Sequence, residues 1–195
     1  MYKRQVWYVY DTFELEWAVI LNTINIRDSD RFTPNGWAFY QDGSGVNIVA
    51  GGTPVRLTID GAGSATEESF LPRSIRGISS LWSNDTLTGI TEGDAYDIRV
   101  QFVIVDTSSN PQRFTVVLDI GPTPDGTGGA GSILITEESK TLKTGTPQTH
   151  IVTFPAFTLA TFIANRGTFW VSADSGSVEI ETRSILITRT SSGKS

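Results

Sequence analysis

The chain has 195 residues and a net charge of −6, and charged residues make up only 18% of it. This length suits one sizeable β domain or a domain with an arm. The acidic balance argues against nucleic-acid binding, which needs a basic patch, and the absence of cysteine excludes disulfides, thiolate metal sites and cysteine nucleophiles. A chain without cysteine also fits assembly in a reducing cytoplasm.

The first 32 residues are predicted to form an N-terminal arm. They carry dense apolar runs, and residues 6–10 are apolar on both faces of a strand, so both faces need covering. We expect this arm to anchor the protein or to join its copies, through Trp7, Tyr8, Tyr10, Trp17 and Ile20. The basic start lacks a small-residue cleavage site, and no run approaches a membrane span, so we expect neither a signal peptide nor membrane insertion.

The domain proper is predicted to span residues 33–195. Its first half contains short apolar runs at 37–40, 46–49 and 55–59, separated by turn sequences such as Pro34-Asn35-Gly36 and Gly51-Gly52. Short strands with frequent turn signals are typical of a β-sandwich or barrel.

Two longer runs, 97–105 and 114–120, alternate apolar and polar residues with a period of two. Ile98, Val100, Phe102 and Ile104 share one face, as do Phe114, Val116, Leu118 and Ile120. This alternation predicts half-buried strands. The segment between them consists of turn formers, and we expect the two strands to pair as a hairpin.

The second half continues the pattern of strands and turns. Residues 122–132 form a Gly-rich loop, and further strands are expected at 133–135, 150–154, 168–173 and 178–190. Apolar positions change parity within the last run, which predicts a bulge near 182–184. Residues 157–165 could form at most one or two helical turns. With about eleven candidate strands, about eight of them in one double sheet, the sequence predicts an all-β, antiparallel jelly-roll sandwich.

The residues that could carry chemistry are few. His150 is the only histidine, so a multi-histidine metal site is excluded and a surface or interface role is expected. Glu179 with Glu181, and Glu92 with Asp94, could serve a glycosidase, but exposed strand faces and turns are the simpler interpretation. Oxygens of Asp119 and Asp125 could bind calcium, although their spacing matches no EF-hand loop. We therefore expect no enzymatic activity, no cofactor and no metal.

Aromatic residues offer one further kind of site. Trp82 and Trp170 are the tryptophans that could stack on a sugar, because their strand neighbours already supply core residues. Buried packing or subunit contact is the more common role of tryptophan.

A series of short motifs runs through the domain. They are GWAFYQD at 36–42, LTIDGAGS at 57–64, FLP at 70–72, Leu81-Trp82, ITEGDAYDIR at 90–99, VLDIG at 117–121, FPAF at 154–157 and ILITR at 185–189. This pattern resembles the jelly-roll module of tailed-bacteriophage virion proteins, a TNF-like trimeric β-sandwich of head decoration, head fibre and tail fibre proteins. The resemblance implies a homotrimer and brings no catalytic residues.

The expected function is that of a non-enzymatic structural protein on the surface of a phage particle, made in the host bacterial cytoplasm. Its partners would be its own copies, other capsid or tail proteins and a host surface glycan. The alternative is a carbohydrate-binding module, either of a tail fibre or as a free lectin-like domain, and a hydrolase comes third. An exposed aromatic platform would favour the second, and a recessed carboxylate pair the third.

Overall fold

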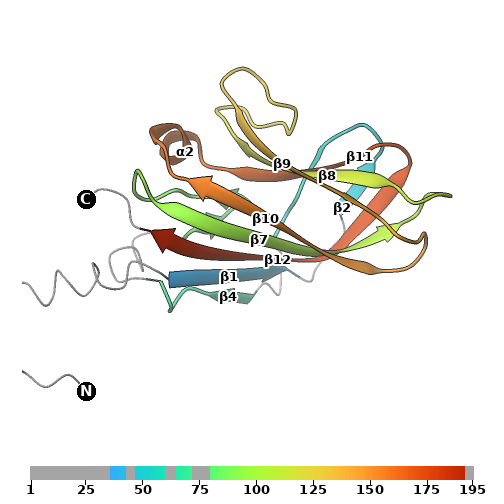
Figure 1. The fold of residues 1–195 in the computed structure, drawn as a ribbon, viewed down its shortest axis with the longest axis horizontal. Helices are drawn as coiled ribbons and strands as arrows, with labels where there is room; N and C mark the ends of the chain where they lie inside the picture. The colour runs from blue at the N-terminus through green and yellow to red at the C-terminus, as the bar shows by residue number, and fades with distance from the viewer. Residues whose placement is uncertain (1–35, 43–46, 60–64, 72–79, 192–195) are drawn as a thin grey trace, which may run out of the picture.

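The computed structural model describes residues 36–42, 47–59, 65–71 and 80–191, which form two antiparallel sheets facing each other (Figure 1). Sheet A contains β1 (Gly36–Asp42), β2 (Asn47–Ala50), β4 (Ala65–Glu67), β7 (Ala95–Asp106), β10 (Gln148–Phe157) and β12 (Ser177–Ser191). Sheet B contains β3 (Val55–Arg56), β8 (Arg113–Ile120), β9 (Ile133–Lys140) and β11 (Thr168–Ala173). A ribbon of β5 (Trp82–Ser83) and β6 (Thr86–Leu87) and the helix α2 (Ala160–Asn165) complete the described elements.

The strand order is that of a jelly roll. Sheet A runs β10-β7-β12-β1-β4, with β2 also paired to β12, and sheet B runs β3-β11-β8-β9. Along the chain from β7, every connection except β8–β9 crosses from one sheet to the other. Two sheets wrapped in this way are the jelly-roll architecture. The predicted all-β, antiparallel jelly roll is confirmed, and α2 fits the one or two turns expected there.

The predicted hairpin of the two long strands is wrong. β7 pairs with β10 and β12 in sheet A, whereas β8 pairs with β9 and β11 in sheet B. The apolar faces of the two strands meet across the interior, where the rings of Phe102 and Phe114 lie edge to face. The alternation of apolar residues shows which face of a strand is buried. It is the same for two strands that pair within one sheet and for two strands that face each other from different sheets, so it does not identify the partner.

The predicted bulge in the last strand is confirmed. Between Ile180 and Arg183, β12 gains one residue relative to β7, whose partners there are Ile104 and Phe102. The extra residue turns Arg183 into the interior, where it is 2% exposed. Its guanidinium forms an ion pair with Asp42 at 3.2 Å and donates to the Ile180 carbonyl.

The core fills the space between the two sheets. Alternate residues of β7 and β8 are buried. The inward residues of β12, beside β7 in sheet A, and of β11, beside β8 in sheet B, are buried as well. No helix within the described ranges is long and apolar enough to cross a membrane.

Candidate subunit interface

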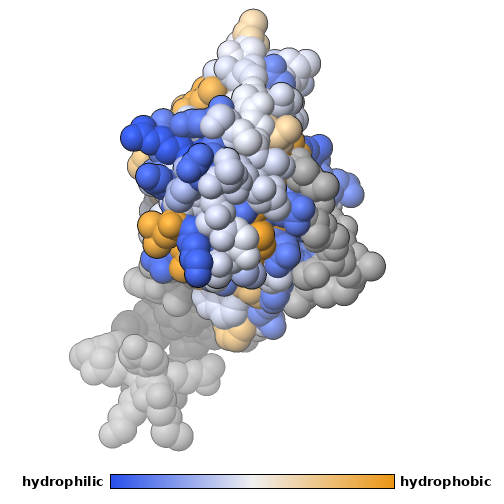
Figure 2. Space-filling model, turned by 90° about the vertical axis from the view of Figure 1, so that its right-hand side faces the viewer, coloured by the Kyte–Doolittle hydropathy of each residue, from blue (hydrophilic) through white to orange (hydrophobic). Residues whose placement is uncertain are grey.

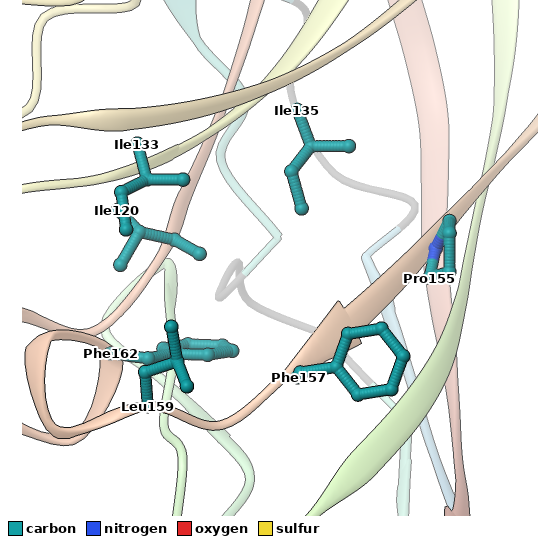
Figure 3. A pocket seen from close by; sticks show the side chains of 7 residues that line it. All are labelled: Ile120, Ile133, Ile135, Pro155, Phe157, Leu159 and Phe162. Carbon is teal, nitrogen blue, oxygen red and sulfur yellow. The ribbon is translucent and has the colours of Figure 1, made fainter.

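An apolar groove runs along the side of the sandwich where β9, the edge of sheet B, approaches β10, the edge of sheet A. It has a volume of about 170 Å³. Figure 3 shows its side chains around an open space, with isoleucines of β9 facing Pro155 and Phe157 of β10. We call this surface the edge groove; it consists of Ile120, Ile133, Ile135, Pro155, Phe157, Leu159 and Phe162.

The edge groove exposes side chains that belong to the core side of sheet B. Ile133 pairs with Ile120 and so lies on the same inward face, yet Ile133 is 41% exposed and Ile120 only 4%. The difference arises because sheet A ends at β10 and leaves the inner face of β9 partly uncovered. Phe157 and Leu159, at the rim, are 69% and 53% exposed. One side of the core is therefore open to solvent.

A second apolar surface lies on the outer face of sheet A. Trp37 and Phe39 alternate with the buried Ala38 and therefore point outward, and Phe39 pairs with Leu186 of β12. The Trp37 ring stacks on Phe70 with centroids 4.5 Å apart, and Phe70 is more than half exposed. We call Trp37, Phe39, Phe70 and Leu186 the outer aromatic patch.

The two surfaces lie at one end of the sandwich, and Pro155 of the edge groove shares the outer face of sheet A with Trp37. Trp37 pairs with Thr188, Thr188 with Asp97, and Asp97 with Pro155 of the edge groove. Three strand spacings separate Trp37 from Pro155, a distance of about 14 Å. One chain thus presents two apolar surfaces that are separated by the width of β7 and β12.

The opposite end of the sandwich is polar. There Asp106 binds the connecting loops together, since its side chain accepts hydrogen bonds from Ser108, from the Gln112 backbone (3.0 Å) and from the Thr141 hydroxyl (2.6 Å). Burial opposes the charge, but these hydrogen bonds hold the pKa of Asp106 below its usual range. Figure 2 shows this end, where hydrophilic residues dominate and hydrophobic ones are scattered.

The predicted exposure of Asp94 is wrong. Asp94 is fully buried and forms a 2.8 Å ion pair with Arg189 of β12, and the Tyr96 hydroxyl donates to its other oxygen. Burial beside this carboxylate raises the pKa of Tyr96 above its usual value. Glu92 remains exposed. The pair Glu92 and Asp94 is thus divided between solvent and a structural ion pair.

The other two candidate carboxylates, Glu179 and Glu181, are half-buried on β12. His150, expected at a strand surface or an interface, is half-buried on the inward side of β10 at the open edge. Its ring lies edge-on to Phe114 with centroids 4.9 Å apart, and its Nδ1 is 3.3 Å from the Ser139 hydroxyl of β9. Burial lowers the pKa of His150.

The two tryptophans considered for sugar binding differ in position. Trp82 is 2% exposed and packs against Phe169, so its ring is a core side chain and offers no face to a sugar. Trp170 is half-buried on the outer face of sheet B, where its Nε1 donates to the Thr168 hydroxyl. The predicted anchoring residues Trp7, Tyr8, Tyr10, Trp17 and Ile20 lie outside the described residues.

Sequence reasoning missed the edge groove. Phe157 continues the outward series of β10, and Leu159 follows it just before α2. An apolar outward residue at the end of a strand was the available signal. It became meaningful only once β10 was known to be an edge strand.

Comparison with known proteins gives remote likenesses in structure. No protein-family model and no curated protein matches the sequence. Among solved structures, Eiger TNF from S. frugiperda is similar at 12% identity and a TM-score of 0.46, over 82% of this chain and 96% of that one. A Clostridium thermocellum xylanase 10B structure with CBM22-1 and GH10 modules is similar at 13% identity and a TM-score of 0.34, over 82% of this chain and 27% of that one.

Proposed function

We propose that the chain is a non-enzymatic structural protein on the surface of a tailed-bacteriophage particle, as a head decoration, head fibre or tail fibre component. It acts as a homotrimer, and residues 1–32 seat it on the particle. The motifs between Gly36 and Arg189 support the phage context, because they resemble the virion module of such proteins.

The observation that carries the proposal is the exposure of the edge groove next to the separate outer aromatic patch. Covering a large apolar side chain such as Phe157 or Leu159 contributes about 1.5–3 kcal/mol. Exposed apolar surface of this kind marks interaction sites. When the edge groove of one copy covers the outer aromatic patch of the next, the contact is heterologous, and a closing rotation produces a ring.

The placement of the carboxylates supports a structural role. Asp42 and Asp94 neutralise buried arginines, and Asp106 holds loops together. A glycosidase needs two carboxyl groups that face each other across a sugar cleft. Glu179 and Glu181 instead lie two residues apart on one strand.

The proposal is tested on purified particles of the phage that encodes the chain. Antibodies raised against the sandwich should decorate intact particles at regular positions in electron micrographs, and the chain should be found by mass spectrometry of the same particles. An unlabelled particle that lacks the chain would refute the virion role. Tight glycan binding by free monomers, lost in Trp170→Ala, would favour the carbohydrate-binding alternative.

A further inference from the structure

The Gly-rich loop between β8 and β9 folds over the outer face of sheet B, at the top of Figure 1. Gly126 has a φ of +75°, and a Cβ atom there would lie 2.7 Å from the Cβ of Trp170 and 2.9 Å from that of Pro54. A Cβ on Gly128 would lie 2.9 Å from the side chain of Leu134. Only glycine permits so close an approach of loop and sheet.

Beneath the loop lies a buried carboxylate that is only half satisfied. Asp119 points outward from β8, because its neighbours Leu118 and Ile120 face the core, and the loop buries it completely. Its Oδ2 accepts hydrogen bonds from the backbone N–H groups of Asp125 (3.0 Å) and Gly126 (2.9 Å). Its Oδ1 is buried without a hydrogen-bond partner. A buried anionic oxygen without a partner is costly.

A second buried oxygen without a partner lies on the same face. The β8–β9 ladder ends at the pair Ile120–Ile133, and Ser132 lies just beyond it against Gly121. A Cβ on Gly121 would overlap the Ser132 hydroxyl, so that hydroxyl fills the space in front of the glycine. Gly121 and Asp119 are two residues apart on one strand and share a face. The Ser132 Oγ and the Asp119 Oδ1 therefore lie on the same face of sheet B, and both are buried without a hydrogen-bond partner.

We propose that a calcium ion binds beneath this loop, with Asp119 Oδ1 and Ser132 Oγ among its ligands. Loop carbonyls and water complete the shell, because the carboxylate of Asp125 is exposed and accepts hydrogen bonds from Thr127. Calcium suits an all-oxygen site of irregular geometry, whereas magnesium demands a regular octahedron. The described residues contain no group of three or more acidic, histidine or cysteine side chains that could hold a metal. Affinity should therefore lie in the weak range of about 10⁻⁴–10⁻³ M.

The negative charge of Asp119 distinguishes calcium binding from a role of Asp119 that is limited to holding the loop. An asparagine at this position keeps an amide oxygen for the two backbone N–H groups, so the loop retains those hydrogen bonds. The same change removes the negative charge that a cation needs. Asp119→Asn should therefore lose calcium binding without losing the loop.

Thermal unfolding of the full chain provides the first test. At millimolar Ca²⁺, compared with EGTA at equal ionic strength, the wild type should gain about 2–4 °C in Tm. Asp119→Asn should show no gain, and in EGTA its Tm should equal or exceed that of the wild type. The exposed Asp174, changed to Asn, removes the same charge at the far end and should keep the gain.

Terbium luminescence provides a second readout that does not depend on stability. Trp170 packs under the loop, so its excitation should sensitise Tb³⁺ bound there, and Ca²⁺ should compete for the site. Ser132→Ala should weaken Tb³⁺ binding about tenfold. Three results would overturn the proposal: no Tm gain and no luminescence in the wild type, an equal gain in Asp119→Asn, or an equal gain with Mg²⁺. If Asp119→Asn fails to fold, the wild-type and Ser132→Ala titrations decide.

Discussion

The rings of Phe102 and Phe114 meet edge to face across the interior of the sandwich, with centroids 5.8 Å apart. Phe102 belongs to sheet A and Phe114 to sheet B, and both are fully buried. This contact joins the two sheets near their open edge, because the His150 ring packs against both phenylalanines.

Removing one of these rings should destabilise the sandwich strongly. Phe114→Ala leaves a cavity between the sheets and should lower the free energy of unfolding by about 3–5 kcal/mol. Leu142→Ala, at an 83% exposed site, should change it by less than about 0.5 kcal/mol. Urea denaturation at one fixed protein concentration measures both. Equal effects of the two substitutions would contradict the described core.

The buried ion pair of Asp94 and Arg189 gives a second prediction. Arg189→Met leaves the Asp94 carboxylate without this partner and should cost about 3–5 kcal/mol of unfolding free energy. Arg99 forms an exposed pair with Asp97, and Arg99→Met should cost less than about 1 kcal/mol. The same urea titration compares them. If Arg189→Met were as mild as Arg99→Met, Asp94 would have to be hydrated.

The stability of the sandwich should depend on His150 in mildly acidic solution. Burial lowers its pKa in the folded state, whereas the unfolded chain keeps a value near 6.5. The contribution of neutral His150 to the free energy of unfolding is therefore complete above pH 6.5. It is lost as the pH falls from there through the pKa of His150 in the folded state. The chain has no other histidine, and Asp106 titrates at much lower pH.

His150→Phe keeps a ring against Phe114 but cannot take up a proton. Its unfolding free energy should stay level between neutral pH and mildly acidic pH, while that of the wild type falls. Denaturant titrations across this range make the comparison. A wild-type profile as flat as that of the variant would place His150 in solvent.

The N-terminal arm can be tested separately from the sandwich. Deleting residues 1–31 should leave the β-sheet circular dichroism of the sandwich intact, because the described core lies entirely between Gly36 and Ser191. The truncated protein should no longer join phage particles. Normal incorporation would mean that the anchor lies elsewhere in the chain.

The sequence predicted those features of the fold that depend on residues close together along the chain. Alternation at 98–104 and 114–120 identified the buried faces, and the change of parity after Ile180 identified the bulge. It could not identify strand partners, since paired strands and facing strands share the same pattern. Asp94 follows a glycine in a turn sequence and looked exposed, because Arg189 is 95 residues away.

The edge groove could not be predicted for a related reason. Whether Ile133 and Phe157 are covered depends on where sheet A ends, which is a property of the whole topology. Trp82 lies on a strand of two residues, too short for any periodicity to show that it is buried. For the proposed calcium site the sequence indicated Asp119, whereas the position of Ser132 beside Gly121 depends on how the loop folds.

The mass of the purified protein in solution tests the central claim most directly. At micromolar concentration, mass photometry or sedimentation should give three times the 21.2 kDa of one chain. Phe157→Asp, in the edge groove, should give a folded monomer, while Leu142→Asp, at the polar end, should remain trimeric. A stable wild-type monomer, or a Phe157→Asp variant that still forms trimers, would contradict the account.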